Sequence, residues 1–371
     1  MVLICQLLSK SIKYCTKAQN RKMLSIICSA DCLNQKNWTK QRLTLCSRVS
    51  LHSVIDYGPQ RMLNLSDKVK KIIIIAATMP LTVRLRVDLR RKWLARLELG
   101  IAQRAHLIMI AHPKSGNTWL KVMLSRLYQV RFNLPDNVLN KSDEYSRQYP
   151  EIPRLAASNG YYSYEGVIGD DLNVDNPDST LRNKQILFIA RNPIDIAVSW
   201  YFQFTKRQSA RKQELINHFI EHPIDRHSIS MWDFVRHSDI GLPFLIQYLN
   251  SWEQNLSNCP NGLIIRYEDL RAQPVKTLTL ITKLMGESFS EEEIRQAVEY
   301  GGFENQRQLE SKGFFKQGGM TLRNPKDTES FKTRRGKVGG YIDYFNPEQI
   351  QELEDLMMSS LSPTFNYHPI D

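Results

Sequence analysis

Short apolar runs alternate along this chain with segments that carry apolar residues at helical spacing. Leu107–Ala111 and Ile186–Ala190 are apolar at every position, which is typical of strands buried on both faces of a sheet. After the first run and a short polar turn, Thr118–Tyr128 repeats apolar residues on one helix face. This alternation predicts an α/β fold, in which a central parallel sheet is flanked by helices within a single main domain.

Further elements are predicted downstream. Met231–Trp252 is predicted to be helical, as are Lys276–Met285 and Glu291–Tyr300. Pro193 suits the first turn of a helix after the second apolar run, because its missing N–H is not needed there. Leu134–Arg182 is a long polar stretch with scattered aromatic residues, and segments of this kind usually carry substrate-binding loops.

Residues 62–104 carry a different pattern. The apolar run Ile72–Met79 ends at Pro80, so it is shorter than the roughly 18–20 residues that span a bilayer. Beyond it, apolar residues recur every fourth position with Arg and Lys between them, at Leu85, Leu89, Trp93 and Leu97. This predicts a basic amphipathic helical segment that either lies on an anionic membrane surface or packs on the main domain with its charged face in water.

Charge is unevenly distributed along the 371 residues. The net charge is +12, yet residues 1–104 hold 20 Lys and Arg against 5 Asp and Glu, while residues 105–371 hold 30 against 33. The main domain, 105–371, is therefore not predicted to bind nucleic acid over a diffuse basic surface. With Cys259 as its single cysteine it cannot form an internal disulfide.

The first 61 residues are basic and lack a clear periodicity. They are predicted to form a weakly ordered N-terminal extension. A targeting segment and translated sequence upstream of a true start at Met62 are the alternatives that the sequence leaves open.

The turn after the first apolar run carries the candidate chemistry. A buried strand, the small polar turn Pro113–Asn117 and a helix start together make an anion site, because loop amides and the helix N-terminus direct partial positive charge at a phosphate. Lys114 adds a full charge. The order differs from the Walker pattern, since Lys114 precedes the only glycine, Gly116.

Pro113–Leu120, which reads Pro-Lys-Ser-Gly-Asn-Thr-Trp-Leu, resembles the sulfate-donor loop of the sulfotransferase family. The family uses 3′-phosphoadenosine 5′-phosphosulfate (PAPS) and usually has Thr where this chain has Asn117. The resemblance implies a P-loop NTPase-like sheet and a lysine, Lys114, that faces the leaving-group oxygen. It also implies donor contacts from Lys114, Ser115, Gly116, Asn117, Thr118 and Trp119.

Three more segments resemble the family in the same chain order. Arg191 and Ser199, eight residues apart, match the pair that grips the donor's 3′-phosphate. Tyr267 ends a strand in a Tyr-Glu-Asp sequence near the nucleotide, and Phe303 matches the aromatic residue that lies against the adenine, opposite Trp119. The Arg-Arg-Gly sequence of Phe331–Phe345 resembles the phosphate-binding C-terminal loop, through Arg334, Arg335 and Gly336.

The family's usual general base has no counterpart here. Between Ala111 and Arg191 the only histidine is His112, and Tyr164 takes the place where cytosolic members have a catalytic His. Glu165 follows it, and a Glu serves as base in some carbohydrate-modifying relatives. Glu165 is therefore the first candidate for the base, with His112 the second, and Lys114 completes the predicted catalytic set.

The resemblance implies an enzyme that moves a sulfuryl group from PAPS to a hydroxyl or amine acceptor, with PAP as product and no metal. The acceptor is expected to be a small molecule, a glycan or a lipid. A catalytically inactive PAPS- or PAP-binding regulatory protein is the main alternative, and an ATP-dependent P-loop kinase is a further one. Localisation is predicted to be cytoplasmic, with peripheral membrane contact through 62–104; the oligomeric state is left open.

Overall fold

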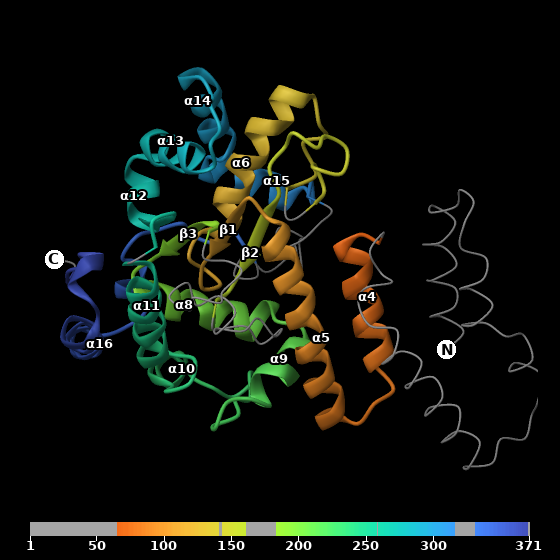
Figure 1. Cartoon of the computed structure of the whole chain (residues 1–371). Helices are drawn as coiled ribbons and strands as arrows, with labels where there is room; N and C mark the ends of the chain where they lie inside the picture. The colour runs from red at the N-terminus through yellow and green to blue at the C-terminus, as the bar shows by residue number, and fades with distance from the viewer. Residues whose placement is uncertain (1–64, 141–142, 161–182, 258, 316–330, 370–371) are drawn as a thin grey trace, which may run out of the picture. The chain divides into compact units, whose positions relative to one another are not determined.

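A four-stranded parallel sheet lies at the centre of the chain (Figure 1). The computed structural model describes residues 65–140, 143–160, 183–257, 259–315 and 331–369. Within them the strands β1 (Leu107–Ile110), β2 (Leu155–Ser158), β3 (Gln185–Ala190) and β4 (Gly262–Arg266) follow the spatial order β2-β1-β3-β4. All three pairings are parallel, which confirms the predicted α/β class.

Alternate residues of each strand enter two separate cores, one on each face of the sheet. On one face Ile108 and Phe188 pack with aromatic residues that include Trp200 and Trp252. On the other face Met109 and Leu187 pack with leucines of the first long helix and with apolar residues farther along the chain. Burial on both faces is why these strands read as continuous apolar runs rather than as alternating patterns.

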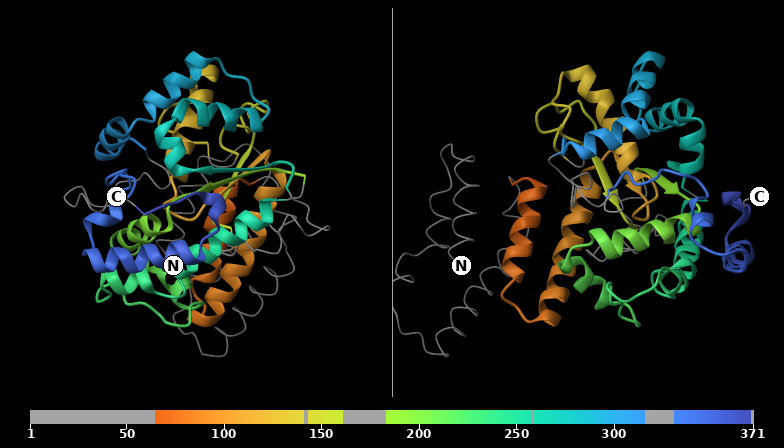
Figure 2. Two further views of the ribbon diagram at one scale, coloured as in Figure 1. Left: turned by 90° about the vertical axis from the view of Figure 1, so that its left-hand side faces the viewer. Right: turned by 180° about the vertical axis from the view of Figure 1, so that it is seen from behind.

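Helices cover both faces (Figures 1 and 2). The second core receives side chains from α6 (Asn117–Phe132), α12 (Tyr267–Ala272), α13 (Pro274–Leu284) and α14 (Glu291–Tyr300). The first core receives them from α5 (Val83–Arg104), α8 (Pro193–Phe202), η3 (Gln203–Arg207), α9 (Ala210–Asn217), α10 (Met231–Arg236) and α11 (Leu242–Ser257). The remaining described elements are α4 (Asp67–Thr78), α15 (Phe303–Ser311), η6 (Gly340–Asp343), α16 (Pro347–Ser360) and η7 (Pro363–Phe365).

The predicted helix over Met231–Trp252 is divided into two. It consists of α10 and α11, separated by residues 237–241. Pro243 explains the break, because a proline is tolerated in the first turn of a helix but disrupts a helix interior. Gly241 occupies the turn, where a Cβ would lie only 2.4 Å from the carbonyl oxygen of Val235.

The described part of the segment 62–104, residues 65–104, contains two adjacent helices, α4 and α5, with Pro80 between them (Figure 1). The packed face of α5 differs from the predicted one. Leu94 is 1% exposed and Val87 is fully buried, whereas Leu85 of the predicted apolar face is 44% exposed. Of the two settings considered from the sequence, packing on the main domain is therefore the one observed for α5.

A buried arginine accounts for the difference in the packed face. Arg90 is 1% exposed; its Nε donates to the hydroxyl of Thr78 at 2.9 Å, and its guanidinium lies 3.9 Å from the Glu214 carboxylate of α9. A prediction from hydrophobicity alone assigns every arginine to the solvent-exposed face of a helix. The apolar face predicted for α5 is therefore rotated about the helix axis relative to the packed face that the structure shows.

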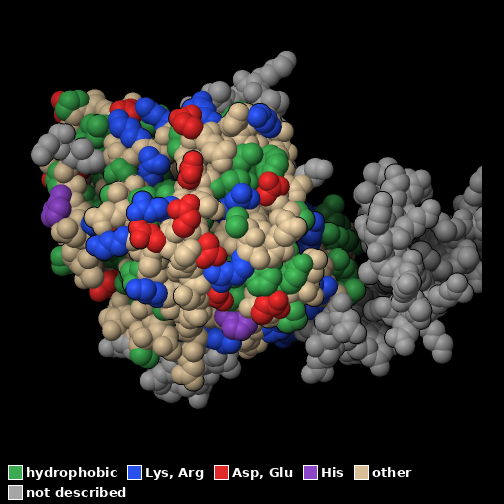
Figure 3. All heavy atoms as spheres, turned by 90° about the horizontal axis from the view of Figure 1, so that it is seen from above, with side chains coloured by type: hydrophobic (Ala, Val, Ile, Leu, Met, Phe, Trp, Pro, Cys, Tyr) green, Lys and Arg blue, Asp and Glu red, His purple; other side chains and the backbone are tan. Residues whose placement is uncertain are grey.

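Charged side chains of both signs are interspersed on the face seen in Figure 3, with no continuous basic expanse. This agrees with the near-neutral balance of residues 105–371. In the described part of the chain, every helix is too short or too polar to span a bilayer.

We expect Leu94→Ala to lower the free energy of unfolding by about 2–5 kcal/mol, because it leaves a cavity under α5. Leu85→Ala, the matched change on the exposed side of the same helix, should alter it by no more than about 0.5 kcal/mol. Denaturant unfolding of both variants measures this, and equal losses would contradict the observed orientation of α5.

Candidate functional site

The turn between β1 and α6 has an unusual backbone conformation. Lys114 has φ +89° and Gly116 has φ +94°, both in the left-handed region that favours glycine. A Cβ on Gly116 would lie 2.6 Å from the Tyr267 ring, so this loop packs directly against the residue that follows β4. The turn therefore brings its backbone amides to the carboxyl edge of the sheet, where ligands bind in open α/β folds.

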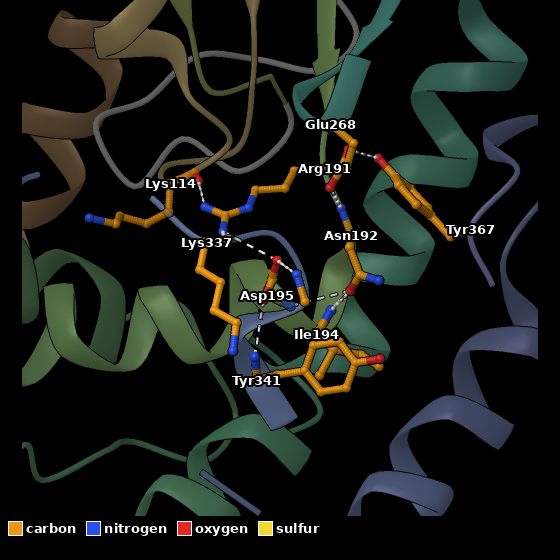
Figure 4. A network of polar contacts seen from close by, with 10 residues as sticks. Lys114, Arg191, Asn192, Ile194, Asp195, Glu268, Lys337, Tyr341 and Tyr367 are labelled. Atoms are coloured by element: carbon orange, nitrogen blue, oxygen red, sulfur yellow. Dashed lines mark hydrogen bonds and ion pairs between the residues drawn. The ribbon is translucent and has the colours of Figure 1, made fainter. Parts of the chain in front are cut away.

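Arg191 joins this loop to the C-terminal loop. It follows β3 directly, and its guanidinium donates to the carbonyl oxygens of Lys114 at 3.0 Å and Lys337 at 3.2 Å. The same guanidinium lies 4.5 Å from the centre of the Tyr267 ring. Figure 4 shows the guanidinium between Lys114 and Lys337, with the Lys114 side chain pointing away from it.

Asp195 in the first turn of α8 fixes both Arg191 and the C-terminal loop. Its carboxylate accepts hydrogen bonds from the backbone N–H of Gly339 at 2.9 Å and of Tyr341 at 3.2 Å, and it pairs with Arg191 at 3.3 Å (Figure 4). Asn192 caps the same helix by accepting from the N–H of Ile194, and Pro193 takes the first position as predicted. A helix start thus anchors a loop that lies almost 150 residues farther along the chain.

A second carboxylate supports the end of β3 from the opposite side. Glu268 accepts from the Asn192 N–H and from the Tyr367 hydroxyl, each at 3.0 Å. Burial raises the pKa of Glu268 above its ordinary value. Burial by itself would lower the pKa of Arg191, but Asp195, Tyr267 and Glu268 raise it. The net pKa of Arg191 is above its ordinary value, and the guanidinium therefore stays charged.

These loops enclose a cavity of about 560 Å³. Of the thirteen residues predicted to bind the donor, twelve line it: Lys114, Gly116, Asn117, Thr118, Trp119, Arg191, Ser199, Tyr267, Phe303, Arg334, Arg335 and Gly336. The thirteenth, Ser115, is fully buried behind the lining and donates its N–H to the His112 carbonyl at 3.1 Å. Segments predicted separately are therefore brought together around one space.

Two aromatic residues predicted to hold a purine are fixed in the cavity wall. The Trp119 indole donates to the carbonyl of Gly301 at 2.6 Å and meets the Tyr267 ring edge-on, at 5.8 Å between centroids. Phe303 packs against Gly336 so closely that a Cβ there would lie 2.7 Å from the ring. Contacts within the protein therefore fix the positions of both rings.

Of the predicted catalytic residues that the structure describes, Lys114 lines this cavity and His112 does not. His112 is fully buried and lies edge-on to the rings of Trp200 and Tyr248. Burial lowers its pKa to about 3, which makes it a poor proton acceptor. Glu165 lies outside the described residues. Among the described residues that line the cavity there is neither a histidine nor a glutamate.

Several lining residues were not predicted from the sequence. The charged ones among them are Asp195 and a set of cations, Arg207, Arg211, Lys212, Arg271, Lys332 and Lys337. No short motif marks them, although the Lys and Arg density of 206–212 is visible in the sequence. Desolvation and the neighbouring cations lower the pKa of Lys114 well below its ordinary value. The cavity is therefore suited to a polyanion, which would relieve this repulsion.

Acidic, histidine and cysteine side chains form no group of three or more that could hold a metal ion within the described ranges. Cys259 is buried as a free thiol.

A parallel sheet with a glycine loop and converging cations at its carboxyl edge defines a protein that binds a phosphorylated nucleotide. The family model for the sulfotransferase domain matches residues 104–365, so the chain belongs to the sulfotransferase family and is a transferase. The match covers all the segments that form the cavity.

Curated relatives are similar along most of their length. Cytosolic sulfotransferase 17 of Arabidopsis thaliana is 24% identical over 278 residues, which cover 68% of this chain and 73% of the relative. Sulfotransferase 6B1 of Danio rerio is 22% identical over 270 residues, covering 71% of this chain and 80% of that protein.

Solved structures with a similar chain trace include mouse sulfotransferase SULT7A1 complexed with PAP, at 18% identity and a TM-score of 0.45. That match covers 72% of this chain and 89% of the mouse chain. Retinol dehydratase in complex with androsterone and PAP matches at 16% identity and the same TM-score, covering 71% of this chain and 85% of that chain.

We predict that Asp195→Asn lowers the free energy of unfolding by about 1.5–3 kcal/mol, because buried hydrogen bonds to a charged group are lost. Asp355→Asn on the exposed surface of α16 is the control, with an expected change within about 0.5 kcal/mol. Urea titrations of both variants measure the difference, and a wild-type midpoint for Asp195→Asn would show that the C-terminal loop is held by other contacts.

Proposed function

We propose that this protein transfers the sulfuryl group of PAPS to a hydroxyl or amine acceptor and releases PAP. One observation carries the proposal: the Lys114 loop, Arg191 and the Arg334–Gly336 loop converge on a single cavity, although they lie up to 222 residues apart in the chain. Two hydrogen bonds from Arg191 connect the outer loops directly.

Each part of the donor has a matching group in this cavity. Arg191 and Ser199 would hold the 3′-phosphate, and Arg334 and Arg335 would add charge from the C-terminal loop. The rings of Trp119 and Phe303 would bind the adenine. Lys114 would then lie at the 5′ end, beside the bond that breaks.

In the reaction the acceptor oxygen or nitrogen forms a bond to sulfur while the bond from sulfur to the 5′-phosphate oxygen breaks. Negative charge grows on that leaving oxygen, where the Lys114 ammonium stabilises it. The acceptor's proton must pass to a base. We propose Glu165 for this role, since His112 is outside the cavity lining and has a pKa of about 3.

An ATP-dependent kinase and a regulatory protein that binds the nucleotide without turnover, the two alternatives to the sulfotransferase, would make different demands on the same cavity. A kinase needs carboxylates for Mg²⁺, yet Asp195 is the only carboxylate among the described lining residues, and it already bonds Arg191, Gly339 and Tyr341. A regulatory protein that binds the nucleotide without turnover would use the same groups as the enzyme, so only activity separates the two.

We expect PAP to raise the unfolding temperature of the full chain and ATP with Mg²⁺ to leave it nearly unchanged.

Arg191→Ala should weaken PAP binding at least tenfold, and Lys114→Ala should abolish most sulfate transfer from labelled PAPS. Glu165→Gln should slow transfer while PAP binding stays intact, because it removes only the proton acceptor.

Calorimetry with PAP and transfer assays over phenols, alcohols and sugars measure these effects. Silence across the acceptor panel, with PAP still bound, would favour the regulatory protein. Stabilisation by ATP–Mg²⁺ instead of PAP would favour the kinase.

We also propose a cytoplasmic protein that contacts membranes through α4. Four side chains at this helix and its end, Val69, Ile72, Ile73 and Met79, are 36–56% exposed beside Lys68, Lys70 and Lys71. Apolar and basic side chains together suit an anionic lipid surface. The full chain should sediment with vesicles that contain phosphatidylserine, and Ile72→Ser with Ile73→Ser should reduce this; no sedimentation of the wild type would oppose the proposal.

A further inference from the structure

The Arg334–Gly336 loop is held on each side by a buried carboxylate. Downstream of it, Asp195 accepts hydrogen bonds from the backbone N–H groups of Gly339 and Tyr341. Upstream of it, the carboxylate of Glu310 accepts two backbone N–H groups in the same way, and this residue belongs to α15. The two carboxylates together fix the path of the chain into and out of the loop.

Each carboxylate oxygen of Glu310 accepts one of these hydrogen bonds. Oε1 accepts from the N–H of Lys332 at 2.6 Å, and Oε2 accepts from the N–H of Thr333 at 2.8 Å, although both donors lie more than 20 positions farther along the chain. Hydrogen bonds to an ionised acceptor are roughly twice as strong as those between neutral groups. The backbone directly before Arg334 is therefore firmly attached to α15.

A cation compensates this fully buried carboxylate. The guanidinium of Arg207, whose side chain is 6% exposed, lies 3.6 Å from Oε1 of Glu310. Arg207 ends η3, which directly follows α8, the helix that carries Ser199. A buried carboxylate is tolerated when it is paired and hydrogen-bonded in this way. Glu310 therefore connects the loop to the chain segment that follows Ser199, the other predicted contact of the 3′-phosphate.

The same short helix contacts the loop a second time. Phe303, the first residue of α15, lies so close to Gly336 that a Cβ there would be 2.7 Å from its ring. Phe303 lines the cavity, whereas Glu310, about two turns farther along the helix, does not. Thus α15 holds the loop on both sides of the basic pair Arg334 and Arg335.

This attachment bears on how tightly the loop can bind a ligand. Ordering a residue costs conformational entropy, and a loop that becomes ordered only when its ligand arrives subtracts this cost from the affinity. Residues 332–336 are ordered by contacts within the protein instead. The gain applies only to the part of a ligand that the loop contacts, and in the proposed donor complex this part is the 3′-phosphate.

We infer that Glu310 is a positioning residue for the donor, which holds the Arg334–Gly336 loop in the conformation that binds the 3′-phosphate of PAPS. The inference rests on the proposed function and deepens it, because it assigns the recognition of one phosphate to a residue outside the cavity lining.

Two nucleotides test this with the full chain. PAP carries both phosphates, whereas adenosine 5′-monophosphate (AMP) lacks the 3′-phosphate. In calorimetry the wild type should bind PAP about tenfold more tightly than AMP, or better. Glu310→Gln should reduce this ratio by about fivefold or more, by weakening PAP binding and leaving AMP binding nearly unchanged. The amide has the shape of the carboxylate but only one acceptor oxygen, so one backbone N–H would meet an NH₂ group.

Two further variants accompany this substitution. Glu304→Gln makes the same change at an exposed position of the same helix outside the cavity lining, and it should leave both affinities unchanged. Glu310→Asp keeps the negative charge but shortens the side chain by one methylene, so it should reduce the ratio by about twofold to threefold. Thermal unfolding shows which variants are folded, and Glu310→Asp decides the test if Glu310→Gln is not.

The outcomes are separable. An unchanged ratio in the folded Glu310→Gln variant, or in Glu310→Asp where that variant decides, would overturn the inference. So would an equal loss of PAP and AMP affinity, because Glu310 would then support the cavity as a whole and not the 3′-phosphate loop. Equal binding of PAP and AMP to the wild type would also overturn it. Failure of the wild type to bind PAP at all would instead refute the proposed function.

Discussion

The cavity depends on one guanidinium and its carboxylate. Arg191 holds the carbonyl of Lys114 on one side and that of Lys337 on the other, while Asp195 neutralises it and binds the loop that carries Lys337. Separate loops are costly to order on their own, because each loses chain entropy. A shared ion pair at the edge of a rigid sheet fixes several of them at once, and this is why segments far apart in the chain form one site.

This arrangement places cations close together before any ligand arrives. Lys114 and Lys332 both have lowered pKa values, whereas Arg191, which has carboxylates beside it, has a raised one. The fold therefore compensates the arginine that has a structural role, whereas an anionic ligand would relieve the repulsion around Lys114. The cationic side chains are already desolvated when the protein folds. An anion that binds them therefore gains their full electrostatic interaction without a further desolvation cost on the protein side.

The sequence predicted the local parts of this structure well, because their signals are local. The apolar runs marked β1 and β3, and the loop at Lys114 could be located by short motifs. Contacts between distant residues left no such signal. Nothing in the sequence around Glu310 indicates its ion pair with Arg207. Arg90 was assigned to the solvent-exposed face because its partner Thr78 lies on another helix. The role of a residue that acts through a partner far away in the sequence can be recognised only from the folded structure.

The cationic cavity also bears on the missing histidine. A positive field lowers the pKa of any carboxyl group placed in it, so Glu165 would be a weaker base there than a free glutamate. The same field lowers the pKa of an acceptor hydroxyl next to Lys114, because it stabilises the oxyanion that forms. The two effects oppose each other in the proton transfer. A site with this much positive charge can therefore use a weak carboxylate base where a neutral pocket would need an imidazole.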